Sequence, residues 1–195
     1  MDHPAPVEYP VHDLVARRFS PRAFAARPVD ASALRSLFEA ARWAPSAANG
    51  QPWRFVVATQ SDPEAHAAFV GALAEGNQRW ARAAPVLIFA VAEPTRGEGK
   101  PNPHARYDLG QAVAWLSVEA TARGLRVHQM GGFDAERARA AAGIPAELDV
   151  VTAIAVGHPG DPEALPEDLR AREAAPRQRR PQVELVFGSR WGKAW

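Results

Sequence analysis

The order of hydrophobic and polar positions along the chain predicts alternating helices and strands. Asp30 is a suitable N-cap for a helix whose apolar side chains recur three and four positions apart, and Pro45 ends that pattern. The run 86–92 is apolar throughout, which is typical of a strand buried on both faces. Runs typical of strands occur at 53–59, 86–92, 125–128 and 150–156. Further helices are predicted at 11–17, 62–73, 104–123 and 134–143.

The helix predicted at 104–123 bears on assembly, because apolar side chains occur almost all round it. A helix of this kind has to be covered on every side. A single domain of 195 residues can hardly provide that cover alone. We therefore expect part of the cover to come from a second subunit.

The composition changes after residue 160. Residues 160–182 are rich in Pro, Glu and Arg and hold few large apolar side chains, so they are not expected to form a core of their own. We expect a single domain spanning residues 1–195, in which 160–195 is an extended arm over the surface. The arm leads to VELVF at 183–187, a predicted strand, and then to Trp191 and Trp195, which favour burial.

The stretch from Ala44 to Phe55, APSAANGQPWRF, joins the helix after Asp30 to the first strand. Its small residues and its Asn49-Gly50 pair, which is expected to adopt positive φ, predict a tight turn. A flat aromatic ligand could lie against this turn, with Ser46, Asn49 and Gln51 as donors and acceptors. A plain helix–strand connector explains the same residues equally well.

Two other segments are candidate binding elements. Arg18, Ser20 and Arg22 alternate, so an extended backbone would place two cations and a hydroxyl on one side, which suits a phosphate and a polar ring edge. Gly131-Gly132 would let backbone N–H groups approach a ligand closely. Taken alone, a solvated basic loop and an ordinary turn are the simpler interpretations of these segments.

The composition of the chain excludes several classes of function. The chain has no cysteine, which excludes disulfides and thiolate chemistry, and its net charge of +1 gives no basic face for nucleic acid. No signal peptide and no transmembrane segment is predicted, so we expect a cytoplasmic protein. No hydrolytic motif or metal-ligand spacing is present, and His66 is expected to be a packed or surface residue of its helix and not a ligand. A bound cofactor would therefore have to carry any difficult chemical step.

The motifs resemble those of the flavin-dependent nitroreductase family. The stretch at 44–53 resembles its APSxxNxQPW segment, residues 18–24 resemble its R-x-S-x-[RK]-x-F element, and a Gly-Gly segment and C-terminal arginines follow in the same order. The resemblance covers nearly the whole chain. It implies an α+β fold, a three-layer α/β/α sandwich with a mainly antiparallel sheet and a C-terminal strand exchanged in a homodimer.

The resemblance also implies FMN as cofactor and NADH or NADPH as co-substrate. Flavin N5 would carry the hydride, so no catalytic side chain is expected. Arg22 would stabilise the charge of the reduced flavin. The residues assigned to FMN are Arg18, Phe19, Ser20, Arg22, Pro45, Ser46, Asn49, Gln51, Asn77, Gln129, Met130, Gly131, Gly132, Arg177 and Arg179.

Two residues qualify these assignments. Phe19 departs from the family, which often has a basic or polar residue there, so phosphate contacts are expected to differ. His128 lies beside the Gly-Gly segment and could donate a proton, or the strand pattern could point it away.

The resemblance implies an oxidoreductase that reduces nitroaromatics, quinones or similar small acceptors by a ping-pong hydride transfer. Three alternatives remain open at this point. They are the flavin-cleaving benzimidazole synthase branch, a reductive dehalogenase, whose lid residues are not found in 62–103, and a non-catalytic FMN-binding dimer.

Overall fold

The computed structural model describes residues 3–195. The α-helices are α1 (Asp13–Arg17), α2 (Ala31–Arg42), α3 (Pro63–Ala72), α4 (Glu75–Ala81), α5 (Ala105–Ala122), α6 (Ala135–Ala142) and α7 (Glu167–Ala174). The strands are β1 (Trp53–Thr59), β2 (Val86–Ala92), β3 (Thr95–Arg96), β4 (Lys100–Pro101), β5 (Arg126–Met130) and β6 (Asp149–Gly157). The 3₁₀ turns are η1 (Ala47–Asn49), η2 (Pro162–Ala164) and η3 (Gln182–Glu184).

Four strands form one sheet in the order β1-β2-β6-β5, and every neighbouring pair is antiparallel. The two inner strands are the most apolar, and all seven residues of β2 are buried. This agrees with the prediction from the continuous apolar run. The predicted class, a mainly antiparallel sheet flanked by helices, is confirmed.

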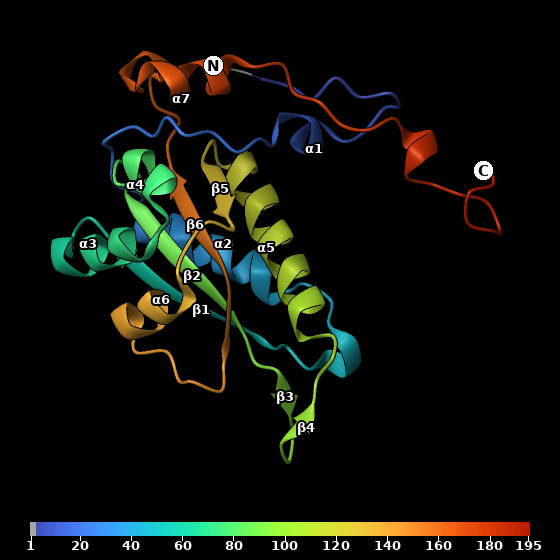
Figure 1. Ribbon diagram of the computed structural model, residues 1–195, viewed down its shortest axis with the longest axis horizontal. Coiled ribbons are helices and arrows are strands. Elements are labelled where there is room, and N and C mark those ends of the chain that lie inside the picture. The colour runs from blue at the N-terminus through green and yellow to red at the C-terminus, as the bar shows by residue number, and fades with distance from the viewer. Residues whose placement is uncertain (1–2) are drawn as a thin grey trace.

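Helices cover both faces of the sheet (Figure 1). Side chains of β2 alternate between two cores: Ile88 and Ala90 pack with α2 and α5, whereas Leu87 and Phe89 pack with α3, α4 and α6. The period of two along the strand thus divides the interior into a core on each side. The arrangement is the predicted three-layer sandwich.

The side of α5 that points away from the sheet is not fully covered within the single chain. Leu109 and Leu116 are buried against α2 and the sheet, but Tyr107 is 69% exposed and Trp115 is 52% exposed. The expectation that a second subunit supplies the remaining cover stays a prediction.

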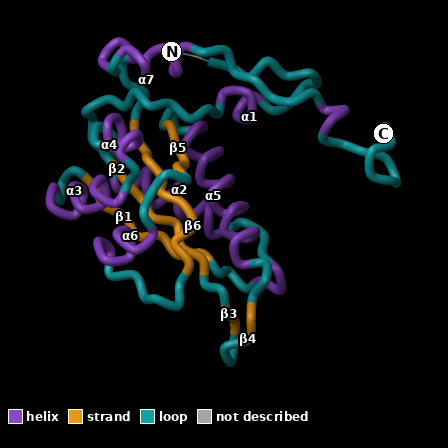
Figure 2. The backbone as a smooth tube through the Cα atoms, viewed as in Figure 1, coloured by secondary structure: helices purple, strands orange, loops and turns teal. Residues whose placement is uncertain are grey.

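The C-terminal arm also differs from its prediction. Residues 167–174 form α7, whose Leu169 is buried, so the arm is not extended throughout. The predicted strand at 183–187 is absent: η3 occupies its start, and Phe187 forms only an isolated bridge with Ala194. An edge strand needs a neighbour to pair with, and the end of the chain runs away from the sheet (Figure 2).

Two connections contain elements that were not predicted. The helix predicted at 62–73 corresponds to α3, and a second helix, α4, follows after Leu73. The connection at 93–103 contains a short hairpin, in which β3 pairs with β4. Among residues 3–195, no helix combines the length and apolar character that crossing a bilayer would need.

Candidate functional site

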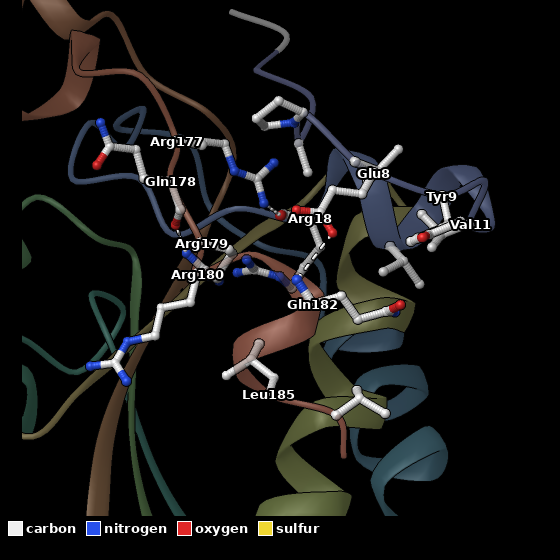
Figure 3. Close-up of a pocket in the computed structure, with 15 residues that line it drawn as sticks. Glu8, Tyr9, Val11, Arg18, Arg177, Gln178, Arg179, Arg180, Gln182 and Leu185 are labelled. Carbon is white, nitrogen blue, oxygen red and sulfur yellow. Dashed lines mark hydrogen bonds between the residues drawn. The ribbon is translucent and has the colours of Figure 1, made fainter. Parts of the chain in front are cut away.

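Three arginines from the two ends of the chain lie together beside the loop after α1. Arg18 donates to the hydroxyl of Ser20 at 3.2 Å. The guanidinium of Arg177 donates to the carbonyl oxygen of Arg18 at 2.8 Å (Figure 3). Arg179 lies close enough to lower the pKa of both other arginines. The structure therefore brings together four of the residues predicted to hold a phosphate.

The electrostatics of this cluster favour an anion. Burial lowers the pKa of Arg18, and the positive charges of Arg177 and Arg179 lower it further. Within residues 3–195, no carboxylate forms an ion pair with any of these three guanidinium groups. A phosphate would relieve this repulsion and accept charge-assisted hydrogen bonds from the guanidinium groups.

The cluster borders a groove of about 710 Å³ between the two ends of the chain (Figure 3). Its polar side is formed by the arginines at 177, 179 and 180 together with Arg18. Its apolar side combines the N-terminal segment with the C-terminal arm. The apolar lining residues include Val7, Val11, Val15, Leu185 and Val186.

Arg22 is held by a carboxylate that the sequence analysis did not identify. The backbone N–H of Arg22 donates to both carboxylate oxygens of Glu173, at 3.0 and 2.9 Å, and its guanidinium lies 3.9 Å from the same group. Glu173 is only 8% exposed. The contact fixes the backbone of Arg22, a predicted flavin-facing residue, through a carboxylate 151 positions further along the chain.

His128 packs under the same loop. Its Nδ1 lies 2.8 Å from the carbonyl oxygen of Pro21, and because a carbonyl only accepts, Nδ1 carries the proton. Its ring contacts Trp80, with centroids 4.4 Å apart, and burial is the main cause that lowers the pKa of His128 to about 4. A histidine that stays neutral in this way is a support for the loop and a poor proton donor near neutral pH.

Asn77, which the family resemblance assigned to the flavin ring, lies against the Gly-Gly segment. Its Nδ2 donates to the carbonyl oxygen of Gly132 at 2.9 Å, and a Cβ on Gly132 would approach that nitrogen to 2.8 Å. The absence of a side chain at Gly132 therefore makes this contact possible. A Cβ on Gly131 would meet nothing within 4 Å, so its backbone borders open space.

The other predicted ligands near this segment differ in exposure. Gln129 is exposed and its amide nitrogen lies 3.4 Å from the hydroxyl oxygen of Ser117. Met130 is 3% exposed, which leaves its side chain in the core. Any contribution of Met130 to a ligand would therefore come from its backbone.

Phe19 lies elsewhere, beside the N-terminal segment. It packs edge-on against His3, and its ring centroid lies 5.5 Å from Cζ of Arg126.

The turn after Pro45 is tight, but only one residue of the predicted Asn49-Gly50 pair has a positive φ. Asn49 has φ 53°, as expected, whereas Gly50 has φ −69° and the other positive values fall on Ala48 and Gln51. The hydroxyl of Ser46 accepts the N–H of Gln51 at 3.1 Å, which closes the turn. The turn thus uses three residues with positive φ, none of which is glycine, and each of them adopts a strained backbone conformation.

A buried carboxylate anchors this turn to α5. Asp108 is 2% exposed and accepts the N–H of Ala47 at 3.1 Å. The turn consequently sits at the N-terminal end of α5, whereas Arg126, which contacts Phe19, follows the other end (Figure 1). An 18-residue helix is about 27 Å long. One chain therefore keeps the turn apart from the arginine cluster.

Sequence reasoning missed three residues that shape the site: Glu173, Trp80 and Asp108. Asp108 stands among the apolar positions of its helix, next to Leu109 and one turn before Ala112, and this position is a signal that could have identified it. Glu173 has no comparable signal, because it stands in a segment rich in Glu and Arg. Among the described residues, no group of side chains has the arrangement of a metal site.

The residues present fit FMN at two points. The unneutralised arginine cluster fits its phosphate, and the open space beside Gly131, next to Asn77, fits a flat ring edge that backbone N–H groups can approach. Arg22 follows Arg18 and Ser20 in the same segment of the chain.

Comparison with known proteins places these features in context. The sequence model of the nitroreductase family matches residues 15–158. A crystal structure described as an oxidoreductase containing FMN is 39% identical, covers 97% of this chain and 96% of its own, and superposes with a TM-score of 0.91. A Xanthomonas oryzae protein, provisionally named an NADH dehydrogenase/NAD(P)H nitroreductase, is 33% identical over 70% of this chain and 80% of its own.

A relative with a different name is more distant. The 5,6-dimethylbenzimidazole synthase of Rhodospirillum rubrum is 28% identical over 75% of this chain and 80% of its own.

Proposed function

The chain belongs to the nitroreductase family, and from this premise we propose that it is an FMN-dependent NAD(P)H oxidoreductase that reduces small nitroaromatic, quinone or similar acceptors. The observation that carries the proposal is the arginine cluster, which brings Arg18, Arg177 and Arg179 together from opposite ends of the chain without a carboxylate to neutralise them. The related oxidoreductase that contains FMN supports the same cofactor.

The side chains would bind and orient, and the cofactor would supply the redox step. When bound, FMN accepts a hydride from a reduced nicotinamide and passes it to a second substrate in the same pocket. Arg18, Ser20 and Arg179 would hold the phosphate. Arg22 would face the ring edge where negative charge develops, and its backbone is already fixed by Glu173.

A homodimer is part of the proposal, because one chain holds the predicted ligands in two separate places. Three features support it: the turn at Ser46–Gln51 lies at the opposite end of α5 from the arginine cluster, α5 has an uncovered apolar face, and the end of the arm is exposed. A two-fold partner would place its own turn beside this arginine cluster. Its edge strand would also give residues 183–187 a neighbour.

The direct test of the proposal is the chromophore. Denatured full-length protein is expected to release a yellow compound that co-elutes with FMN, because no cysteine is present to hold it covalently. Bound flavin should then bleach on addition of NADH or NADPH and recover its colour with a quinone or nitroaromatic. Release of FAD, or no uptake of added FMN, would contradict the proposal.

The relative from Rhodospirillum rubrum favours one second candidate, a flavin-cleaving benzimidazole synthase. The two activities leave different products. A reductase returns FMN unchanged after many turnovers, whereas a synthase consumes it. Flavin that bleaches slowly and does not turn over would instead indicate a non-catalytic FMN carrier.

Arg22 and Arg179 are expected to act on different parts of FMN. Arg22→Ala should lower the two-electron reduction potential by roughly 30 mV, a tenfold change, because a cation near the reduced ring is lost. Arg179→Ala should weaken FMN binding about tenfold and leave the potential nearly unchanged. Spectroelectrochemistry and fluorescence titration measure the two effects, with exposed Arg35→Ala as control. Equal phenotypes would refute this division of roles.

A further inference from the structure

The loop that carries Arg18, Ser20 and Arg22 is held at its C-terminal end by a buried anion. Both oxygens of Glu173 accept the N–H of Arg22, and one also accepts the N–H of Ala23 at 3.4 Å. A carboxylate that is 8% exposed is tolerated only when its hydrogen bonds are satisfied. These backbone donors satisfy it, so the contact is a specific attachment of α7 to the loop.

The N-terminal end of the same loop is held by a cation from the same arm. Nη1 of Arg177 donates to the carbonyl oxygens of His3 and Ala16, both at 2.8 Å, and Nη2 donates to that of Arg18 at 2.8 Å. Three of its five N–H groups are therefore taken by backbone. Within residues 3–195, the guanidinium of Arg179 donates only to the adjacent carbonyl of Gln178.

We propose that Glu173 and Arg177 are positioning residues that clamp residues 16–23, the end of α1 and the loop after it, from both ends, and that Arg177 acts through Arg18 instead of binding phosphate itself. The inference rests on the proposed function, because it concerns how the FMN ligands are placed. The two contacts are complementary: the carboxylate of Glu173 accepts hydrogen bonds from backbone N–H groups, and the guanidinium of Arg177 donates hydrogen bonds to backbone carbonyls. Between them the side chains of Arg18 and Ser20 are left to face a ligand.

The clamp makes lysine a poor replacement for Arg177. Lysine keeps the positive charge and binds phosphate well as a point charge. Its single ammonium group cannot reproduce the planar fork that reaches three carbonyl oxygens. Glu173→Gln likewise preserves shape, but it presents an amide N–H, which is a donor, toward the backbone donors of the loop.

The test measures the affinities of the full-length protein for FMN and for riboflavin, which lacks the phosphate. In Glu173→Gln and in Arg177→Lys, the preference for FMN over riboflavin is expected to fall about tenfold, because Arg18 and Ser20 are misplaced. Glu167→Gln and Arg172→Lys are matched controls on the exposed side of α7 and should stay within about twofold of the unsubstituted protein.

Two results would overturn the proposal. If Arg177→Lys kept the preference for FMN while Arg177→Met lost it, Arg177 would be a phosphate ligand. If affinities for FMN and riboflavin fell in parallel, Glu173 and Arg177 would support the fold in general and not the phosphate ligands.

Amide exchange separates this proposal from the proposed function. The N–H groups of Arg22 and Ala23 should exchange at least about tenfold faster in Glu173→Gln than in the Glu167→Gln control, with or without FMN. An unsubstituted protein that bound no flavin would refute the proposed function, and the exchange rates would still report the clamp. Unchanged exchange would refute the clamp itself.

Discussion

Removal of residues 183–195 is expected to abolish the dimer and, with it, FMN binding. Within one chain this segment makes almost only local contacts, such as the bridge between Phe187 and Ala194, and Trp191 and Trp195 are 90% and 88% exposed. Its loss would therefore cost a monomer little stability. In a dimer that pairs 183–187 with the partner's sheet, the same deletion removes a large apolar part of an obligate interface.

Light scattering at roughly 5 µM protein, in a range where an obligate dimer stays assembled, measures the mass before and after truncation. FMN-free full-length protein is the control, and it should remain a dimer, because the interface is built by the chain. A full-length protein that is a yellow monomer would contradict the arrangement. A truncated protein that is still a dimer would show that the arm does not carry the interface.

Acidification is expected to destabilise the protein through His128. The folded-state pKa of about 4 is below the ordinary value of 6.5, so the unfolded chain takes up the proton first as the pH falls. Above pH 6.5 both states are neutral and His128 has no effect. Between pH 6.5 and 4 the free energy of unfolding falls, by about 2 kcal/mol at pH 5 and about 3 kcal/mol at pH 4.

The variant His128→Asn tests this slope, because its amide can replace Nδ1 as donor to the carbonyl of Pro21 and does not titrate. Denaturant unfolding at pH 7 and pH 5, at one protein concentration, compares it with the unsubstituted protein and with His104→Asn at an exposed position. Between pH 7 and pH 5, the free energy of unfolding should fall by about 2 kcal/mol less in His128→Asn than in the other two proteins. Equal losses in all three would exclude His128 as the cause.

The sequence predicted the elements that rest on local pattern. Strand β1 matches its predicted bounds, and Asp134 and Gly143 bound α6 as their capping chemistry indicated. The three-layer arrangement was predictable as well, because apolar side chains that alternate between the two faces of β2 require a core on each side of the sheet. These features depend on residues a few positions apart.

The predictions that failed depend on distant or absent neighbours. Residues 183–187 have strand composition, but a strand forms only where another can pair with it, and the single chain offers none at that place. The positions of positive φ in the turn after Pro45 depend on Asp108, which anchors Ala47. Glu173 could not be found, because its partner lies 151 residues away.

The contacts that clamp residues 16–23 affect the order of folding during synthesis. They join residues 16–23 to Glu173 and Arg177, so closing them costs the loop entropy of about 150 intervening residues. The sheet and its helices, whose contacts are nearer in sequence, can form while the nascent chain still lacks residue 173. The phosphate-binding segment is then completed late, because a ribosome-bound chain shorter than 173 residues has the support of His128 but lacks the contacts at both ends of the segment.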